Sequence, residues 1–451
     1  MVLFHSTNYN TPDVGLKEAI FKGQAFDKGL YMLNTIPILS ESTIHSFINL
    51  KFNQISNIIL LKLFGKVIPE TDLKKIIADA LDFKIPVEKI NNFDYIMFLD
   101  RGPTCSFKDI GARTLARVME YFLNLEEKDM VILTATSGDT GGAVASAFYK
   151  KKRIKVIILY PRNEISDLQR KQMTTLGKNI IAIGIDGKFD DCQRYVKTAF
   201  ADKNLQFLNL TSANSINVGR LLPQTLYYFW AYSRVVKEIN EKVIFVVPSG
   251  NFGNLIGGLI AYRMGLPVKK FISAVNENDE FPLYLRRGIY QKVEPSKHCI
   301  SSAMNVGHPS NFARLIDLYG GIIDETGLIH KNPDLEKIRE DIFAISINDE
   351  STRRTIKSFY QKYNKIIEPH GAVGWAALQK YRKDNLRFYK IKAISLETAD
   401  PAKFPDEIIS LIEITPKIPK SLEAIKNRVE FPNPIEIEKY EDFKSYLLKN
   451  F

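Results

Sequence analysis

Cysteine is scarce in this sequence, and the three that it has, Cys105, Cys192 and Cys299, lie far apart. An odd number of cysteines without a CxxC pair argues against a disulfide framework and against a zinc site. The histidines show no metal-ligand spacing either, so we expect no bound metal. Free thiols suit a reducing compartment, and the first residues lack a secretory pattern, which together predict a cytoplasmic protein.

Long apolar runs are also absent. The most apolar stretch, Val243–Tyr262, is interrupted by Asn251, Asn254 and several glycines, as in a strand, a turn and a helix rather than a membrane span. The formal net charge is +11, but apart from Lys150–Arg153 the basic residues are spread along the chain. No nucleic-acid-binding motif accompanies them, so we expect neither nucleic acid nor a membrane as partner. The positive field favours anionic small molecules.

The length of 451 residues requires more than one core. Residues 1–90 are predicted to form a mostly helical domain, because apolar residues recur at helical spacing in Val14–Lys22 and Ser40–Leu63. Residues 91–415 alternate short apolar runs with helical patterns, which predicts parallel sheets covered by helices and ligand-binding loops at the carboxyl ends of the strands. Residues 416–451 form a charged C-terminal extension. Strands are expected at Met130–Leu133, Lys155–Leu159, Ile180–Ile185, Val243–Val247, Phe271–Ala274 and Ile391–Ser395.

The first chemical motif is GPTCSFKDIGAR, Gly102–Arg113, in which Lys108 begins a helical pattern behind Phe107. A lysine that forms a Schiff base must lose its proton near neutral pH, and burial and nearby positive charge lower its pKa. A lone lysine in the first turn of a helix is more often a surface residue, so the surrounding residues must indicate whether it forms a Schiff base. The motif resembles the GPT-x-x-FKD signature of threonine synthases, and this resemblance implies that Lys108 holds pyridoxal 5′-phosphate (PLP). Arg101 departs from the family pattern, which has histidine before GPT.

The second motif is TATSGDTGGAVA, Thr134–Ala145, between a strand-like and a helix-like run. Small residues allow close backbone approach to a ligand, and a helix N-terminus there favours an anion. An ordinary glycine-rich turn explains the motif equally well by itself. It resembles the family loop around the substrate's carboxylate, which implies that Thr136, Ser137 and Thr140 bind substrate and that Asp139 lies near the O3′ edge of the cofactor.

The third motif is VVPSGNFGNLIGG, Val246–Gly258, another strand followed by a Gly/Asn turn and a helix. Successive N–H groups of such a turn can surround an anion. The motif is not a Walker A loop, because GxxxxGK[ST] is missing. It resembles the family's cradle for the phosphate of PLP, which implies that the cofactor-binding residues are Gly250, Asn251, Phe252, Gly253 and Asn254.

The fourth motif is NSINVGRLLPQ, Asn214–Gln224. An arginine can bind a phosphate in a two-pronged geometry that lysine does not match. An arginine that caps a helix or pairs with a nearby acid is the simpler alternative. The family resemblance implies that Asn214, Ser215 and Arg220 bind the substrate's phosphate, a group that plain serine or threonine dehydratases do not need.

Three C-terminal segments, AMNVGHPSNFARL, EPHGAVG and LETADPAKF, also resemble family segments. The resemblance places Thr398 beside the pyridine nitrogen of PLP, which a hydroxyl leaves neutral or weakly hydrogen-bonded, whereas many other PLP enzymes use an aspartate there. A threonine that merely ends a strand is the alternative. Asp400 departs from the family pattern TAHPAKF, and His370 is interpreted as a structural loop residue.

These ordered matches, which begin with GLKEAIFKGQAFDKGLYML, cover nearly the whole chain. They imply PLP fold type II, with two open α/β units around a cofactor cleft plus the helical N-terminal domain. The implied activity is that of a carbon–oxygen lyase acting on phosphate, which converts O-phospho-L-homoserine and water to L-threonine and phosphate by β,γ-elimination and replacement, the last step of threonine biosynthesis. The expected state is a monomer or homodimer.

A lyase that releases 2-oxobutyrate, ammonia and phosphate from the same substrate is the alternative, and Asp400 is its main support in the sequence. A non-catalytic PLP-binding protein is a further alternative, although such a protein would usually lack the lysine.

Overall fold

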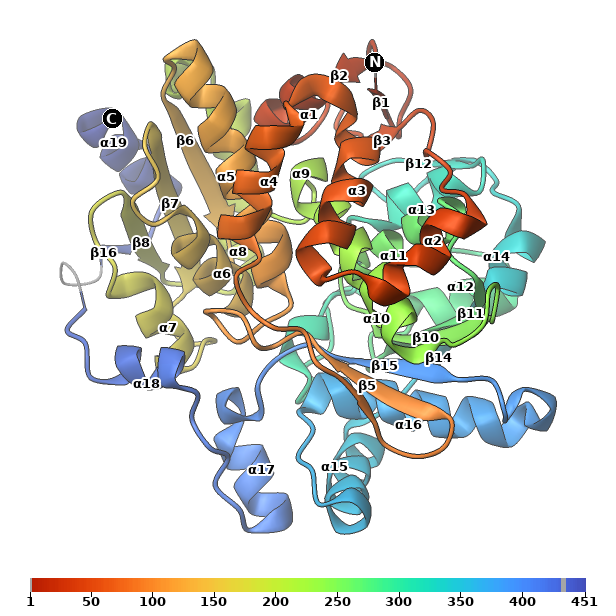
Figure 1. Cartoon of the computed structure of the whole chain (residues 1–451). Helices are drawn as coiled ribbons and strands as arrows, with labels where there is room; N and C mark the ends of the chain where they lie inside the picture. Colours follow the sequence, from red (N-terminus) through yellow and green to blue (C-terminus); the bar gives the residue numbers. More distant parts are fainter. Residues whose placement is uncertain (1, 431–434) are drawn as a thin grey trace.

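Two separate sheets organise the chain in the computed structural model, which describes residues 2–430 and 435–451 (Figure 1). The smaller sheet is parallel throughout and runs, in spatial order, β16 (Ile435–Ile437), β8 (Ile180–Ile185), β7 (Ile154–Pro161), β6 (Met130–Ala135) and β9 (Leu210–Thr211). The larger sheet runs β14 (Ile342–Ser346), β11 (Val268–Val275), β10 (Val243–Pro248), β15 (Ala393–Glu397), β5 (Asp94–Phe98) and β4 (Val87–Lys89), and only β4 is antiparallel to its neighbour. All six predicted strands and their parallel pairing are confirmed.

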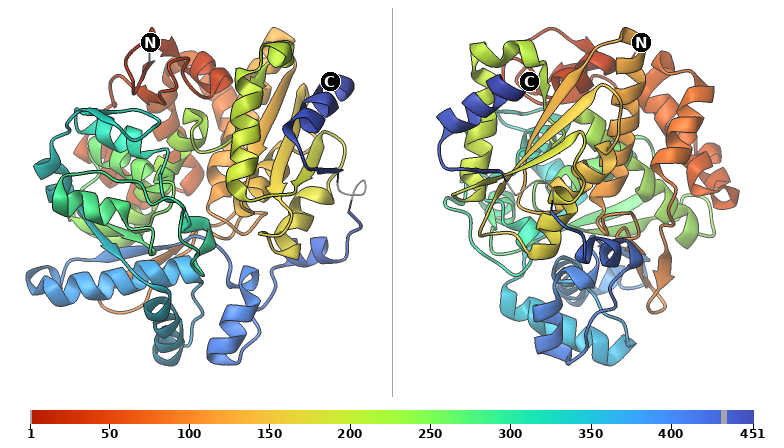
Figure 2. Two further views of the ribbon diagram at one scale, coloured as in Figure 1. Left: turned by 180° about the vertical axis from the view of Figure 1, so that it is seen from behind. Right: turned by 90° about the vertical axis from the view of Figure 1, so that its left-hand side faces the viewer.

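Each face of the smaller sheet has its own apolar core, because successive strand residues point to opposite sides. One face packs against α8 (Phe189–Ala201) and α19 (Tyr440–Asn450), and the other against α5 (Lys108–Glu126) and α6 (Asp139–Phe148). The two turned views in Figure 2 show these helices on both sides of the sheet. The buried runs of β-branched residues in the strands follow from this double coverage.

The larger sheet is covered in the same way. One face packs against α10 (Leu226–Val235) and α11 (Gly253–Arg263), and the other against α15 (Asp349–Tyr363) and α16 (Pro369–Asp384). The remaining helices of the two units are α7 (Asp167–Thr174), α9 (Val218–Leu221), α12 (Glu280–Arg287), α13 (Phe312–Leu318), α14 (Leu335–Asp341), α17 (Pro405–Ile412) and α18 (Lys420–Lys426), and a small hairpin pairs β12 (Ile322–Ile323) with β13 (Ile329–Lys331).

The N-terminal region is mostly helical, as predicted, but it opens with a small sheet that periodicity did not reveal. Its helices are α1 (Leu16–Lys22), α2 (Glu41–Ser46), α3 (Phe52–Phe64) and α4 (Glu70–Ala80), and its antiparallel strands are β1 (Leu3–Ser6), β2 (Val14–Gly15) and β3 (Tyr31–Leu33).

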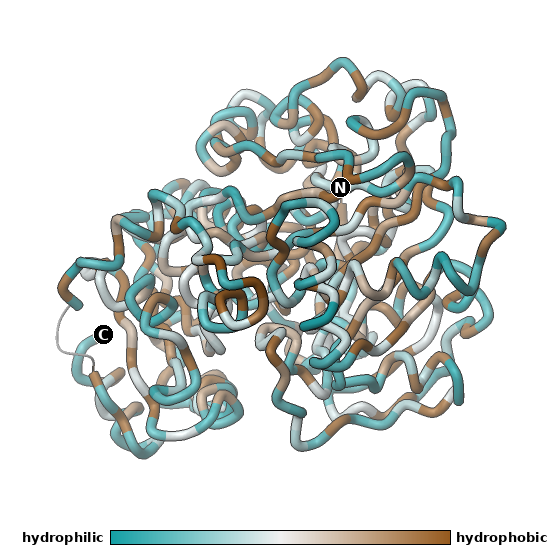
Figure 3. The backbone as a smooth tube through the Cα atoms, turned by 90° about the horizontal axis from the view of Figure 1, so that it is seen from below, coloured by the Kyte–Doolittle hydropathy of each residue, from teal (hydrophilic) through white to brown (hydrophobic). Residues whose placement is uncertain are grey.

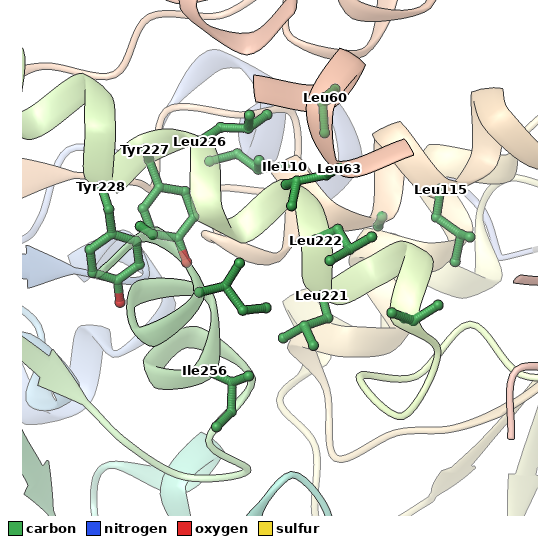
Figure 4. Packing of buried hydrophobic residues seen from close by; sticks show 14 of the residues in the cluster. Leu60, Leu63, Ile110, Leu115, Leu221, Leu222, Leu226, Tyr227, Tyr228 and Ile256 are labelled. Carbon is green, nitrogen blue, oxygen red and sulfur yellow. The ribbon is translucent and has the colours of Figure 1, made fainter. Parts of the chain in front are cut away.

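The N-terminal region shares its core with the rest of the molecule. In Figure 4, Leu60 and Leu63 of α3 lie beside Leu222 and Leu226, with Ile110 of α5 close by. The region is therefore part of the wall that supports α5 and α10.

The C-terminal extension joins the smaller unit. Strand β16 pairs with β8, and Phe443 and Leu447 of α19 are buried against the same face as α8. In Figure 3, hydrophobic segments are short and alternate with hydrophilic ones along the chain. Within residues 2–430 and 435–451, no helix combines the length and the apolar character needed to traverse a bilayer.

Candidate active site

A cleft of about 730 Å³ lies between the two units. The loops that follow β6, β10 and β15 all contribute to its walls, as expected where the carboxyl ends of parallel strands meet. Part of the N-terminal region, including Gln24 and Lys28, also lines it. Every site residue proposed from the sequence lies in this cleft: Lys108, Thr136, Ser137, Asp139, Thr140, Asn214, Ser215, Arg220, Gly250, Asn251, Phe252, Gly253, Asn254 and Thr398.

Lys108 is the first residue of α5, and the backbone ties it to the segment after β15. The Phe107 amide donates to the Thr398 carbonyl at 2.9 Å, and Ser106 forms an isolated bridge with Ala399. Burial lowers the pKa of Lys108 to about 8; Asp139 opposes this shift. A nucleophilic amine is therefore available near neutral pH.

Asp139 and Lys403 form a buried ion pair at 2.9 Å. Gln169 donates a second hydrogen bond to the Asp139 carboxylate at 3.2 Å. Burial alone would raise the pKa of Asp139, but the charges of Lys403 and Lys108 lower it below its usual value. The pair joins the start of α6 to the segment after Thr398, and Lys403 adds positive charge near Lys108.

The glycine-rich loop after β6 is shaped from within by Thr136. Its hydroxyl accepts hydrogen bonds from the amides of Gly138, at 3.0 Å, and Gly141, at 2.7 Å. Gly138 has φ +129°, and a Cβ there would lie 2.6 Å from Gln169. The Thr136 hydroxyl therefore organises the loop, whereas Ser137 is exposed to the cleft and Thr140 is half-buried.

The loop between β10 and α11 approaches its neighbours closely. A Cβ on Gly250 would lie 2.8 Å from the Ala303 carbonyl, and Phe252 adopts the left-handed conformation, with φ 61°, before the helix begins. The hydroxyls of Tyr227 and Tyr228 each donate to Oδ1 of Asn254 at 2.7 Å. The buried Nδ2 of Asn254 has no partner among the described residues, so this loop offers a donor next to a helix N-terminus.

Arg220 is buried and has no acidic partner within ion-pair distance in the described part of the chain. Its guanidinium donates to the Ala213 carbonyl at 2.7 Å, and its Nε has no protein acceptor there. Burial lowers the pKa of Arg220 to about 10. Asn214, nearby in the chain, likewise has a buried Oδ1 without a partner. A buried cation in this setting is suited to an anionic ligand.

Ser215 connects this region to the loop after β10. Its hydroxyl accepts hydrogen bonds from Asn251, at 2.7 Å, and from Asn311, at 3.3 Å. The fully buried Arg314 then holds the Ser215 carbonyl at 3.0 Å and the Tyr31 carbonyl of β3 at 3.0 Å. The N-terminal sheet is thus fixed directly to the cleft wall.

The two departures from the family pattern lie together. Arg101 is 3.5 Å from the Asp400 carboxylate and 3.3 Å from the Asp100 carboxylate. Burial raises the pKa of Asp400 above its usual value and that of Asp100 to about 7, and Arg101 opposes both shifts. Arginine at one position therefore accompanies aspartate at the other. Asp400 also accepts the Ala402 amide at 2.9 Å, so its side chain is engaged within its own loop.

Sequence reasoning missed three residues that shape the site: Lys403, Glu368 and Arg314. Lys403 stands in the quoted LETADPAKF segment, but its partner Asp139 is 264 positions away and no spacing links them. Glu368 begins the quoted EPHGAVG segment, in which the following proline favours a helix start, but nothing there indicates its hydrogen bond to Thr398. Arg314 stands in the quoted AMNVGHPSNFARL segment, but nothing in that segment indicates that it contacts Tyr31 and Ser215.

One group of side chains outside the cleft has ligand atoms close enough to hold a metal ion. Glu277, Cys299 and Asp349 meet within 4.8 Å among the described residues. The Asp349 carboxylate already accepts the Ile300 amide at 3.1 Å. The group therefore fits a loop anchor.

Three family models match the chain in order. Residues 3–81 match the threonine synthase N terminus, residues 83–387 match pyridoxal-phosphate dependent enzymes, and residues 371–446 match the threonine synthase C-terminal region.

Full-length relatives agree with these models. A threonine synthase of Buchnera aphidicola is 37% identical over all of both chains, and that of Escherichia coli is 37% identical over 94% of both. The crystal structure of PLP-bound threonine synthase from Brucella melitensis superposes with a TM-score of 0.91 at 30% identity over 99% of both chains. That of the Escherichia coli enzyme gives 0.88 at 34% identity over all of both chains.

Proposed function

The chain belongs to the threonine synthase family of PLP-dependent enzymes, and we propose on that basis that Lys108 anchors the cofactor and that the cleft residues divide the work of the reaction. The chain converts O-phospho-L-homoserine and water to L-threonine and phosphate. The observation that carries the assignment of roles is that one cleft is lined by a lysine of lowered pKa, a Gly/Asn helix start and an arginine that forms no ion pair with an acid in the described part of the chain.

The described residues fit PLP. The loop Gly250–Asn254 would hold its phosphate, because the N-terminus of α11 and the unpartnered Nδ2 of Asn254 both offer donors to an anion. Asp139, kept ionised by Lys403, would lie at the O3′ edge, and Thr398 at the ring nitrogen. When bound, PLP supplies an electron sink for negative charge that develops at the substrate's Cα.

Lys108 is the proton-transfer residue in this proposal. With a pKa of about 8, its amine is partly unprotonated at neutral pH and could remove the proton from the Cα of a substrate held beside it. The same amine can return a proton to Cα at the end. Its position at the start of α5, tied to Thr398 through the Phe107 amide, keeps it beside the cofactor site.

The substrate's two anionic groups would bind to two neighbouring segments of the cleft, which the hydrogen bond from Asn214 to the Ala135 carbonyl joins. Arg220, Asn214 and Ser215 would hold the phosphate, because no acid of residues 2–430 or 435–451 forms an ion pair with the guanidinium. Ser137 and Thr140, with the amides at the start of α6, would hold the carboxylate. Thr136 supports this loop from inside rather than contacting substrate.

We also place the protein in the cytoplasm as a monomer or homodimer that needs no nucleic acid or membrane. The three cysteines are free and buried, which suits a reducing compartment. Size-exclusion chromatography with light scattering would determine the oligomeric state, and added duplex DNA should not shift the elution volume.

A product assay with O-phospho-L-homoserine tests the function. Equal amounts of phosphate and threonine are expected from the PLP-loaded protein. Phosphate with 2-oxobutyrate and ammonia would instead identify the lyase alternative. Asp400, the feature of the sequence that favoured that alternative, is engaged with Arg101 and with the Ala402 amide.

A further inference from the structure

A fully buried arginine, Arg314 of α13, lies behind the proposed phosphate subsite. Burial lowers its pKa to about 9, and Asp317 opposes this shift, so the guanidinium stays charged at neutral pH. Asp317 itself pairs with His5 at 2.9 Å, and no acid of the described residues lies within ion-pair distance of Arg314. A buried cation without an acid is unfavourable unless its N–H groups bind other acceptors well.

The guanidinium donates four hydrogen bonds, all to neutral oxygens. Its Nε donates to the Tyr31 carbonyl at 3.0 Å, and one terminal nitrogen donates to the Ser215 carbonyl at 3.0 Å and to Oδ1 of Asn311 at 2.6 Å. The other terminal nitrogen donates to the Ile216 carbonyl at 2.6 Å. One rigid, planar group therefore holds two successive carbonyls of the cleft wall.

The direction of the Ser215 carbonyl fixes the direction of the Ile216 amide. The two belong to one trans peptide group, in which the C=O and N–H bonds point to opposite sides. The carbonyl points to Arg314, which has no exposed surface. Ile216, in contrast, is half-buried and lines the cleft. The N–H bond of Ile216 therefore points toward the cleft.

The Ile216 amide has no hydrogen-bond acceptor within residues 2–430 and 435–451. The turn that contains it is closed by the next amide, because Asn217 donates to the Asn214 carbonyl at 3.0 Å. Backbone N–H groups of folded proteins are almost always paired with protein, water or a ligand. The cation on the carbonyl of the same peptide group also polarises the N–H bond and makes it a stronger donor. Such an amide is suited to an anion.

We propose that Arg314 is a positioning residue that aims the Ile216 amide into the cleft, where this amide is a further donor to the phosphate of the substrate. This rests on the proposed function, which places that phosphate at Asn214, Ser215 and Arg220. A main-chain donor has a fixed direction and needs no side-chain ordering, so it complements the long guanidinium of Arg220.

The N-terminal region then takes part in substrate binding. The guanidinium that aims the amide also holds the Tyr31 carbonyl of β3. Asn217 makes a second link, because its Nδ2 donates to the Ile20 carbonyl of α1 and to the Ser212 carbonyl, both at 2.9 Å. The turn at the phosphate subsite is thus held from behind by both β3 and α1.

The test replaces Ile216 with its α-hydroxy acid in the PLP-loaded protein, which exchanges the amide for an ester and removes the N–H group. In titration calorimetry the affinity for inorganic phosphate should fall by roughly tenfold or more, and kcat/KM for O-phospho-L-homoserine should fall by a similar factor. The affinity for L-threonine, which has no phosphate, should stay the same.

The same replacement at Met32 is the matched control. It turns the Tyr31 carbonyl into an ester carbonyl and so weakens another acceptor of Arg314, but it leaves the Ile216 amide in place. Since no donor to the phosphate is lost, the affinity for inorganic phosphate should change by less than about threefold.

Arg314→Lys tests the positioning role. A lysine keeps the charge but lacks the planar group that holds two carbonyls at once. The affinity for phosphate should fall in this variant, and the fall should vanish in the protein that already carries the ester at Ile216, because Arg314 acts through that amide. An equal fall in both backgrounds would give Arg314 a purely structural role and overturn the inference.

Unchanged phosphate affinity in the Ile216 ester would also overturn the inference, while leaving the proposed function intact. Failure of the unchanged, PLP-loaded protein to bind phosphate and to act on O-phospho-L-homoserine would instead overturn the proposed function. If Arg314→Lys does not fold, the ester at Ile216 compared with the ester at Met32 decides the matter.

Discussion

Two parts of the same cleft differ in whether their buried polar atoms have hydrogen-bond partners. Around Thr398, the Glu368 carboxylate has four donors and Lys403 is paired with Asp139. Around Arg220, the guanidinium Nε and the Nδ2 of Asn254 are buried without a partner among the residues that the structure describes. The first part fixes direction and protonation, whereas the second offers binding capacity to anions. Substitutions in the first should therefore affect folding and the cofactor, and those in the second should affect phosphate ligands.

The largest effect is expected where the two parts meet, at Lys108. Lys108→Ala removes anchor and base together, so turnover should fall by more than the ~10²–10⁴-fold typical of losing a general base alone. The absorbance band of lysine-bound PLP should disappear with it. The exposed-lysine variant Lys150→Ala serves as control and should keep both. Substantial activity in Lys108→Ala would contradict the assigned role.

The next largest effect should come from the fully paired part. Lys403→Met leaves Asp139 buried without its closest partner, which should lower the free energy of unfolding by about 3–5 kcal/mol. Urea denaturation of the PLP-free protein measures this. As a control, Lys365→Met, which breaks an exposed pair with Glu88, should cost less than ~1 kcal/mol. Similar losses in both variants would remove the contrast between buried and exposed pairs.

Arg220→Met tests the second part of the cleft, around Arg220. Arg220 would donate a charged hydrogen bond to the substrate's phosphate, and its loss should cost about 1.5–3 kcal/mol of binding free energy. This should reduce kcat/KM for O-phospho-L-homoserine by roughly 10–100-fold. Stability should change little, because Arg220 donates only one side-chain hydrogen bond to the described residues.

Added phosphate should raise the Tm of the unchanged protein but not that of Arg220→Met. Arg314→Met should instead greatly lower the stability of the protein, because the buried guanidinium of Arg314 donates hydrogen bonds to several backbone carbonyls. Phosphate protection that survives in Arg220→Met would place the anion elsewhere.

A pH series should give a moderate effect. Because burial lowers the pKa of Lys108 to about 8, the rate of PLP uptake should fall about tenfold per pH unit below 8 and level off above it. Stopped-flow absorbance measures this rate.

The lowered pKa of Lys108 also predicts the direction in which the stability of the PLP-free protein changes with pH. The folded amine has a lower pKa than the unfolded one, so between about pH 8 and 10.5 the unfolded chain binds more protons. The contribution of Lys108 to the stability of the PLP-free protein should therefore rise with pH across that window. Lys108→Met should remove the pH dependence, and a dependence that persists would assign it to another group.

The smallest effect is expected at the Arg101–Asp400 pair. Arg101 is 42% exposed, so solvent screens the interaction, and Arg101→Met should change stability by less than ~1 kcal/mol. Product ratios should remain unchanged. A shift from threonine to 2-oxobutyrate in this variant would revive the lyase alternative.

The residues that the sequence motifs proposed all line one cleft, because each motif is a contiguous stretch of chain at the end of a strand. Gly250–Asn254 forms a turn followed by a helix start, and its glycine and asparagine residues indicate both features in the sequence. The Lys403–Asp139 pair and the Glu368 network depend on segments that meet only in the folded chain, and no spacing encodes such a meeting.

The fold was predictable to a similar extent. Strands buried on both faces, such as β10, stood out as apolar runs. Strand β14 did not, because it follows α14 directly at Ile342 with no turn residue between them. Strand β5 lies just after the predicted boundary between residues 1–90 and 91–415, and its short apolar run was not among the predicted strands. The short strands of the N-terminal sheet hold two to four residues each, too few to establish a period of two.

The pairing of β16 with β8 has a consequence for synthesis on the ribosome. The smaller sheet gains its edge strand, and its core gains Phe443 and Leu447, only when residues near the end of the chain emerge. The larger sheet likewise waits for β15 to enter between β10 and β5. Neither sheet is complete before these distant segments have been synthesised, so the nascent chain must keep apolar strands protected until then.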